Sequence, residues 1–166
     1  MSAISIDEIR KGDAFVSNAR TLREADIVNF AGLSGDFNPL HTDDEWVREH
    51  TDYPRAIAHG LLVTSIGSGL RHPEIDQWLI VAYLSVERTF VSPAYPGDSI
   101  QQRSVVREVR RSRSNPRNGV VVVDVEIINH EGTVLQSGAD TYLIGSAQDE
   151  ADSAAGSDRT VVGRAR

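Results

Sequence analysis

Cysteine is absent from this chain of 166 residues, and its absence removes a whole branch of protein chemistry. Without thiols there can be no disulfide bridge, no thiolate-bound metal and no cysteine nucleophile. Grouped metal donors are missing too, because His50, His72 and His130 stand in no ligand-like arrangement with other donors. We therefore expect neither a metal site nor a bound cofactor.

Long apolar runs are also missing. No stretch approaches the roughly 20 apolar residues that a membrane-spanning helix needs, and the N-terminus lacks the basic and apolar regions of a signal peptide. The net charge of −7 argues against non-specific nucleic-acid binding over the whole surface. We expect a cytoplasmic protein that has neither a membrane nor a nucleic acid as its partner.

The composition changes near the C-terminus. Residues 146–166 are rich in Ala, Asp, Ser and Gly and show little apolar periodicity, which is typical of disorder. We predict one domain over residues 1–145 and a disordered tail over 146–166. A core of that size is small, so association with another subunit would help to stabilise it.

Short helices are expected in the first part of the chain. Residues 15–21 can form a first strand, and Thr21 to Glu24 has the form of a capping box for a helix that ends near residues 32–35. A second capping box, Thr42 to Glu45, predicts another short helix. Residues 61–70 carry no charged side chain and are apolar or small on every side, which favours a helix that is buried all round.

The pattern changes from Trp78 onward. Four segments are rich in Val, Ile, Thr and Tyr and are separated by turn signals; they span 79–90, 99–109, 120–128 and 133–144. Short connections imply that consecutive strands are antiparallel neighbours. One enclosed helix followed by long antiparallel strands predicts a sheet that curls around that helix.

The segment from Ser34 to His41 carries the most chemical information. Asp36 and His41 are five positions apart, and Pro39 between them prevents a continuous helix. A turn can thus bring a carboxylate and an imidazole towards one point, where they could hold and deprotonate a water molecule. Taken alone, the segment favours the plainer interpretation of an Asx turn at a rigid corner.

A second candidate segment is His59-Gly60, where the enclosed helix should begin. A helix N-terminus presents unpaired N–H groups and the positive end of the dipole. Glycine there lets a ligand approach the backbone, so the Gly60 N–H could stabilise a developing oxyanion. His59 could contact the substrate or could fix a loop through a backbone hydrogen bond.

Three segments resemble the signatures of the MaoC-like hydratase and dehydratase family, which includes the (R)-specific enoyl-CoA hydratases. The first is highly specific and covers 20–27 and 30–43; the second is 57–62; the third lies within 90–98. The resemblance extends from about Ile4 to Ile144, which is nearly the whole predicted domain.

This resemblance implies an α+β hotdog fold, in which an antiparallel sheet wraps around a long central helix. By the same resemblance, Asp36 and His41 hold the catalytic water, Gly60 supplies an amide to the thioester carbonyl, and Asn38 orders the catalytic loop. Ser68 falls where related hydratases place a hydroxyl near the active-site carboxylate. Family members are usually dimers or larger, with sites at subunit interfaces, so we expect a homodimer or a higher homo-oligomer.

The expected activity is (R)-specific hydration of 2-enoyl-CoA to 3-hydroxyacyl-CoA, or the reverse dehydration. One alternative is a dehydratase that acts on the same acyl group attached to an acyl carrier protein. Two further alternatives are a hotdog acyl-CoA thioesterase and a non-catalytic acyl-thioester binder. The complete segment from Asp36 to His41 argues against both of these.

Two other groups of residues have open interpretations. The arginines of segment 99–109 and of the hairpin that follows it could bind the phosphates of coenzyme A or of a carrier protein, or could simply cover a solvated hairpin; they are Arg103, Arg107, Arg110, Arg111, Arg113 and Arg117. Trp46, Trp78 and Tyr83 could line an acyl pocket, although aromatic residues in so small a core usually serve packing.

Overall fold

The segments rich in β-branched residues form the body of the molecule. The computed structural model describes residues 3–113 and 115–146, and the long strands are β3 (Ile80–Phe90), β4 (Ser99–Arg111), β5 (Asn118–Ile128) and β6 (Val134–Gly145). Each strand boundary lies within two residues of the sequence prediction. β4, β5 and β6 are joined as antiparallel neighbours. Most of the predicted tail lies outside the described residues, although Ser146 is described and is buried.

The order of the strands differs from the expectation in one respect. The six-stranded sheet has the order β1-β4-β5-β6-β3, so β3 lies at an edge and pairs with β6 instead of β4. The short segment 91–98 crosses the end of the sheet from β3 to β4. It is held there by Ala94, whose carbonyl oxygen accepts the Ala58 N–H at 2.8 Å. This crossing brings the segment beside the beginning of the central helix.

The predicted first strand is interrupted. It forms β1 (Ala14–Val16) and β2 (Arg20–Thr21), and both pieces pair with β4. The break follows from Ser17, whose hydroxyl oxygen accepts the Gln102 N–H at 2.8 Å and takes the place of a backbone carbonyl. The prediction of a single strand over residues 15–21 was therefore wrong.

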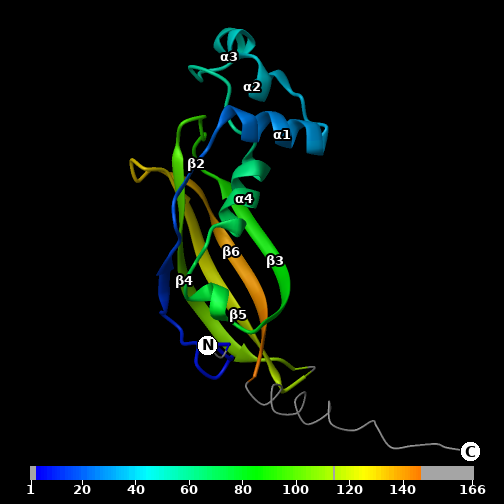
Figure 1. Cartoon of the computed structure of the whole chain (residues 1–166), viewed down its shortest axis with the longest axis vertical. Helices are drawn as coiled ribbons and strands as arrows, with labels where there is room; N and C mark the ends of the chain where they lie inside the picture. Colours follow the sequence, from blue (N-terminus) through cyan, green and yellow to red (C-terminus); the bar gives the residue numbers. More distant parts are fainter. Residues whose placement is uncertain (1–2, 114, 147–166) are drawn as a thin grey trace, which may run out of the picture.

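Three helices form a cap at one end of the sheet (Figure 1): α1 (Glu24–Ser34), α2 (Pro39–Thr42) and α3 (Asp44–His50). Both predicted caps are displaced along the chain. Thr21 remains in β2, and the Asp26 carboxylate accepts the Arg23 N–H at 2.8 Å at the start of α1. At α3 the capping side chain is Asp43 and not Thr42, since α2 already occupies Thr42.

The central helix α4 (Gly60–Gly69) runs from the cap along the concave face of the sheet (Figure 1). It buries Leu62, Val63 and Ile66 in the core, and a methyl group on Gly67 would lie 2.4 Å from Ile127 Cδ1. The prediction of a helix buried all round was wrong, because Leu61 is 64% exposed. The α+β hotdog architecture, a sheet curled around this helix, is confirmed.

A short 3-10 turn, η1 (Ile75–Gln77), precedes β3. Among the described residues, none of the helices has both the length and the apolar character that crossing a membrane would require.

Candidate active site

The turn that carries Asp36 begins where α1 ends. Gly35 adopts a left-handed conformation with φ 78°, which ends the helix, and its N–H donates to the Ala31 carbonyl. The Asp36 N–H then donates to the Ser34 hydroxyl at 3.2 Å, and Asp36 Oδ1 accepts the Asn38 N–H at 3.2 Å. These local bonds make an Asx turn that holds Asp36 Oδ1 against the backbone, while Oδ2 faces His41 and His59.

Asn38 starts the next element. Its side-chain oxygen accepts the Leu40 N–H at 2.9 Å and so caps α2, with Pro39 at the first helical position. The expected loop-ordering role of Asn38 thus has a structural counterpart, since α2 carries His41. Asn38 acts on backbone groups of the turn and does not line the pocket that contains Gly60.

His41 has a defined proton position. Its Nδ1 lies 2.8 Å from the Ile57 carbonyl oxygen, which can only accept, so Nδ1 carries the proton and donates. In the neutral ring, Nε2 is then an acceptor. It lies 3.9 Å from Asp36 Oδ2, and the two side chains are 12% and 51% exposed respectively.

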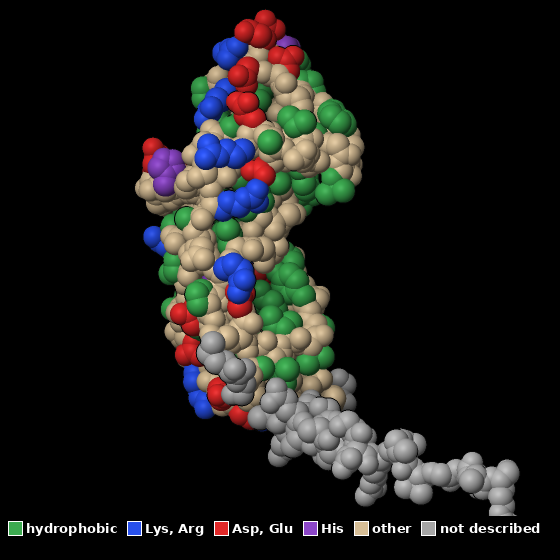
Figure 2. Space-filling view, viewed as in Figure 1, with side chains coloured by type: hydrophobic (Ala, Val, Ile, Leu, Met, Phe, Trp, Pro, Cys, Tyr) green, Lys and Arg blue, Asp and Glu red, His purple; other side chains and the backbone are tan. Residues whose placement is uncertain are grey.

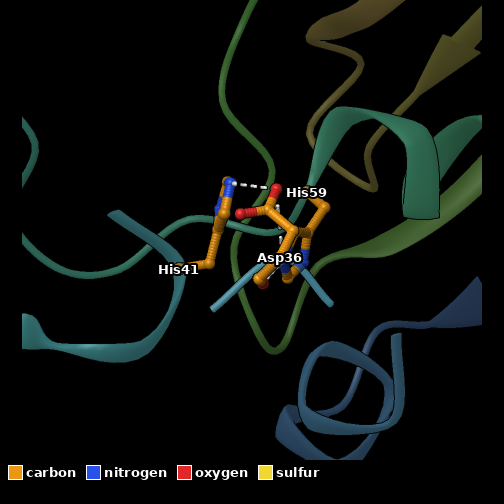
Figure 3. A group of neighbouring side chains, drawn as sticks. All are labelled: Asp36, His41 and His59. Atoms are coloured by element: carbon orange, nitrogen blue, oxygen red, sulfur yellow. Dashed lines mark hydrogen bonds and ion pairs between the residues drawn. The ribbon is translucent and has the colours of Figure 1, made fainter. Parts of the chain in front are cut away.

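His59 is the third side chain of the group formed with Asp36 and His41. Its ring is 3% exposed and lies 3.8 Å from the His41 ring, centroid to centroid. His59 Nε2 is 2.9 Å from the backbone carbonyl oxygen of Asp36 and 3.9 Å from its carboxylate. Figure 3 shows the three side chains converging on one point from the turn, from α2 and from the start of α4.

The 3.9 Å gap between Asp36 and His41 has a chemical meaning. Both facing atoms, Oδ2 and Nε2, are hydrogen-bond acceptors, so they cannot bond to each other. A water molecule about 2.8 Å from each could donate one hydrogen to the carboxylate and the other to the imidazole. Its lone pairs would then be free to attack a third atom.

The same three side chains could be considered as metal ligands, because their donor atoms lie within 4.8 Å of one another. His59 Nε2, however, faces two oxygen atoms of Asp36, so this nitrogen must carry the proton. A protonated ring nitrogen cannot bind a metal ion, and two remaining ligands fall short of the three protein ligands of a catalytic zinc site. The donor set fits a water-holding site better than a metal site.

Gly60 opens onto a pocket of about 340 Å³ next to His41. As the first residue of α4, Gly60 is among the positions whose N–H groups have no acceptor within the helix. A side chain there would collide with the Phe90 ring, which lies 3.0 Å from the position of a Cβ atom. Apolar walls come from Val63, Val91 and Leu135. A thioester carbonyl at the helix N-terminus would therefore have an acyl-sized cavity beside it.

A second pocket of about 430 Å³ lies on the other side of His41. It is lined by Asp43, Asp44 and Glu45 and does not contain Gly60. The carboxylates of Asp43 and Asp44 are occupied, since they accept backbone N–H groups of residues 45, 46 and 56. The larger cavity therefore lacks an amide donor for a thioester oxygen.

Ser68 is not brought to this site within the chain. It lies eight residues beyond Gly60 on α4, which is about 12 Å along a helix axis. Its hydroxyl donates to the Ser65 carbonyl oxygen at 2.9 Å. Any contact between Ser68 and a catalytic carboxylate would have to involve another subunit.

The arginine cluster extends along β4 into the hairpin beyond it, and this hairpin lies at the end of the sheet opposite the cap (Figure 1). Three of its members pair with acids: Arg107 with Asp124, Arg110 with Glu108, and Arg111 with Asp7. This arrangement fits the solvated hairpin and gives no phosphate site near the catalytic turn.

The aromatic candidates also serve packing. Trp78 is 6% exposed in the core, Trp46 stacks on His50, and Tyr83 stacks on Tyr142. None of the three lines the pocket with Gly60; the ring that does so from the sheet is Phe90. Phe90 lies in the third signature segment, but its position in the sequence gave no indication that it contacts Gly60.

Several named proteins are similar to this chain in sequence. The chain is 36% identical over 110 residues to protein MaoC of Klebsiella aerogenes, covering 65% of this chain and 32% of that protein. It is 34% identical over 89 residues to the (R)-specific enoyl-CoA hydratase of Aeromonas caviae, covering 54% of this chain and 65% of the hydratase. The chain thus spans about a third of the first relative and just under two thirds of the second.

Solved structures agree in fold. A protein of Archaeoglobus fulgidus, called a monoamine oxidase regulatory protein, has a TM-score of 0.78 and 29% identity over 89% of this chain and 97% of its own. The MaoC-like dehydratase of Rhodospirillum rubrum has a TM-score of 0.72 at 23% identity, covering 86% and 97% of the two chains. The family model described as the MaoC like domain matches residues 9–128. This chain, with its paired carboxylate and imidazole at the head of an enclosed helix, belongs to the MaoC-like domain family.

Proposed function

We propose that the chain is a hydro-lyase that adds water to a 2-enoyl thioester to give the (R)-3-hydroxyacyl thioester, and that it catalyses the reverse dehydration. The observation that carries this proposal is the 3.9 Å gap between two acceptors, Asp36 Oδ2 and His41 Nε2. The names of several relatives support the reaction class, among them (R)-specific enoyl-CoA hydratases and a 3-hydroxyacyl-thioester dehydratase.

The reaction follows from the arrangement of donors and acceptors. The thioester oxygen accepts the Gly60 N–H, which draws electrons from the double bond towards the carbonyl. The water held by Asp36 and His41 loses a proton to this pair, and its oxygen bonds to Cβ. The electron pair of the double bond moves to Cα and the carbonyl, and the proton returns to Cα from the same side.

Coenzyme A is the proposed carrier, with an acyl carrier protein as the alternative. A carrier-protein dehydratase of Arabidopsis thaliana is 29% identical over 99 residues, so the family contains both kinds of substrate. The carboxylates of Asp43, Asp44 and Glu45 line the neighbouring pocket. They would repel the phosphates of coenzyme A and an acidic carrier protein alike, so they do not choose between the two carriers.

We also propose that the chain works as a homodimer joined through β3. The strand has a free edge, and its large apolar side chains are exposed: Val81 by 53%, Leu84 by 51% and Val86 by 45%. Figure 2 shows hydrophobic side chains gathered on the flank where Figure 1 places β3. An exposed, apolar strand edge of this length is suited to pairing with a second copy.

The decisive test of the reaction uses crotonyl-CoA and longer enoyl-CoA esters. We expect loss of the conjugated double bond and formation of the (R)-alcohol. Asp36→Asn should reduce turnover by at least about a hundredfold, the usual scale for loss of a general base. Asp124→Asn is a matched control, since this carboxylate is half-exposed and pairs with Arg107 away from the site.

Three outcomes would contradict the proposal. Unchanged turnover in Asp36→Asn would remove that carboxylate from the reaction. Release of free coenzyme A without hydration would favour a thioesterase, whose water attacks the carbonyl carbon instead of Cβ. Binding of enoyl-CoA with no reaction of either kind would favour a non-catalytic binder.

A further inference from the structure

Gln136 is a buried polar side chain that the proposed reaction does not use. It lies on β6, 76 residues after Gly60, and is only 2% exposed. It nevertheless lines the pocket that also contains His41 and Gly60. A buried amide in an otherwise apolar wall requires hydrogen-bond partners, and its partners identify its role.

Both ends of the Gln136 amide are bonded to the first turn of α4. Its Nε2 donates to the Gly60 carbonyl oxygen at 2.7 Å, and its Oε1 accepts the Thr64 hydroxyl at 2.9 Å. The orientation of the amide is unambiguous, because a carbonyl oxygen can only accept and must face the NH₂ group. Sheet and helix are thus locked together at the point where the helix meets the pocket.

The bond to Gly60 has an electronic consequence. In a helix this carbonyl already accepts the N–H of residue 64, so Gln136 adds a second donor to the same oxygen. Hydrogen bonds to a peptide carbonyl strengthen the N–H of that peptide as a donor. The peptide concerned joins Gly60 to Leu61, so the N–H that is strengthened is that of Leu61. It is one of the donors of the first turn that have no partner within the helix.

We propose that Gln136, oriented by Thr64, is a positioning residue for the thioester oxygen. It fixes the first turn of α4 against the sheet, which aims the Gly60 N–H at the thioester oxygen, and it polarises the Gly60–Leu61 peptide, which strengthens the neighbouring Leu61 N–H as a donor. This inference rests on the proposed function, because it assigns the helix start to a thioester carbonyl. Gln136 touches neither the water nor the reacting carbons.

The test uses Gln136→Met, which keeps the length of the side chain and removes both hydrogen bonds. We expect kcat for crotonyl-CoA to fall about tenfold to a hundredfold, with KM changed much less, since misplaced electrostatic donors act on the transition state. Thr64→Val should act in the same direction to a smaller extent, because it frees the amide without removing it.

A spectroscopic measurement separates positioning from folding. Butyryl-CoA labelled with ¹³C at the carbonyl cannot be hydrated, and its carbonyl stretch in the infrared reports the hydrogen bonds that the oxygen accepts. In the wild-type complex we expect a shift to lower frequency, and in Gln136→Met a return towards the value of free butyryl-CoA. Gln102→Met is the control: this glutamine is also buried, at 3%, but it lies near Gly67 at the other end of α4.

The outcomes distinguish the two proposals. A carbonyl stretch in Gln136→Met and Thr64→Val equal to that of the wild-type complex would overturn the positioning role, even if activity fell. An equal change in Gln102→Met would also overturn it, because any buried amide would then have the same effect. Failure of the wild-type protein to hydrate any enoyl-CoA would instead overturn the proposed function.

Discussion

At the scale of single residues, the site depends on how an exposed carboxylate is held still. The Asp36 side chain is 51% exposed, and its position is set by backbone contacts rather than by burial. His59 makes the principal contact from outside the turn, through its bond to the Asp36 carbonyl oxygen. Of the two roles considered for His59, substrate contact and loop fixation, this bond supports loop fixation.

We predict that His59→Leu lowers kcat by about one to two orders of magnitude, because the turn loses its external hydrogen bond and the catalytic carboxylate is misplaced. His59→Gln should retain more activity, since an amide NH₂ can replace the ring N–H. Steady-state kinetics on crotonyl-CoA measures both. Equal activity of the leucine and glutamine variants would show that the bond to Asp36 has no part in turnover.

A buried histidine, His72, should make the stability of the folded protein depend on pH. His72 is 5% exposed, and burial lowers its pKa from 6.5 despite the opposing influence of Asp76 and Glu74. The unfolded chain therefore binds the proton more readily than the folded protein, so stability is lost as the pH falls below 6.5. The urea midpoint should decrease from pH 7.5 to pH 5.5, and His72→Gln should flatten that decrease. A steeper decrease in the variant would contradict this origin.

The part of the site that could be predicted consists of residues close together in the sequence. Asp36, Asn38 and His41 lie in one short segment, so their turn chemistry could be interpreted directly. Gln136 and Phe90 meet Gly60 only because strands far away in sequence fold against the helix. Nothing in the alternating pattern of a strand distinguishes an inward residue that packs from one that holds a helix end.

At the scale of elements, β3 and β6 are joined by a buried ion pair. Arg88 Nη1 lies 2.7 Å from Asp140 Oδ1, and the side chains are only 4% and 1% exposed. The Tyr142 hydroxyl donates to the other carboxylate oxygen, and burial raises the pKa of that hydroxyl above its ordinary range. The tyrosine therefore remains a neutral donor beside the carboxylate.

We predict that Arg88→Met destabilises the protein by about 3–5 kcal/mol, because it leaves the Asp140 charge buried without a partner. The double variant Arg88→Met, Asp140→Leu should be less damaging than Arg88→Met alone, since neither charge then remains. Urea unfolding of the wild type, Arg88→Met, Asp140→Leu and the double variant gives the comparison. Additive losses in the double variant would show that the two groups stabilise the sheet independently.

The elements themselves were largely predictable, and the errors have physical causes. Strand and helix ranges followed from residue periodicity and turn residues, as in α4 and β5. The pairing of β3 with β6 was missed because a short connection usually joins neighbours, whereas segment 91–98 crosses the end of a curled sheet. Similarly, Leu61 was expected to be buried because a sequence alone cannot reveal which face of a helix lacks a cover.

At the scale of the whole molecule, the uncovered face of α4 and the free edge of β3 are the two features that a second copy would cover. We predict a homodimer by sedimentation velocity, and a shift to monomer in the variant Leu84→Lys, Val86→Lys, because two charges along the strand edge oppose pairing. Val105→Lys is the control, since this valine is 44% exposed on β4, inside the sheet. A dimer that persists unchanged in the double variant would place the interface elsewhere.

Strand β3 contributes both to the proposed dimer interface and to the pocket with Gly60. Along its length it carries the edge at which copies are proposed to join, and at its last residue Phe90 rests against Gly60, the proposed amide donor. A change in the conformation of the strand would therefore move Phe90 against Gly60 and alter the proposed hydrogen bond to the thioester oxygen. Such an enzyme would not have one fixed specific activity: the rate per chain would decline on dilution, and the abundance of the protein in the cell would itself set how fast each molecule works.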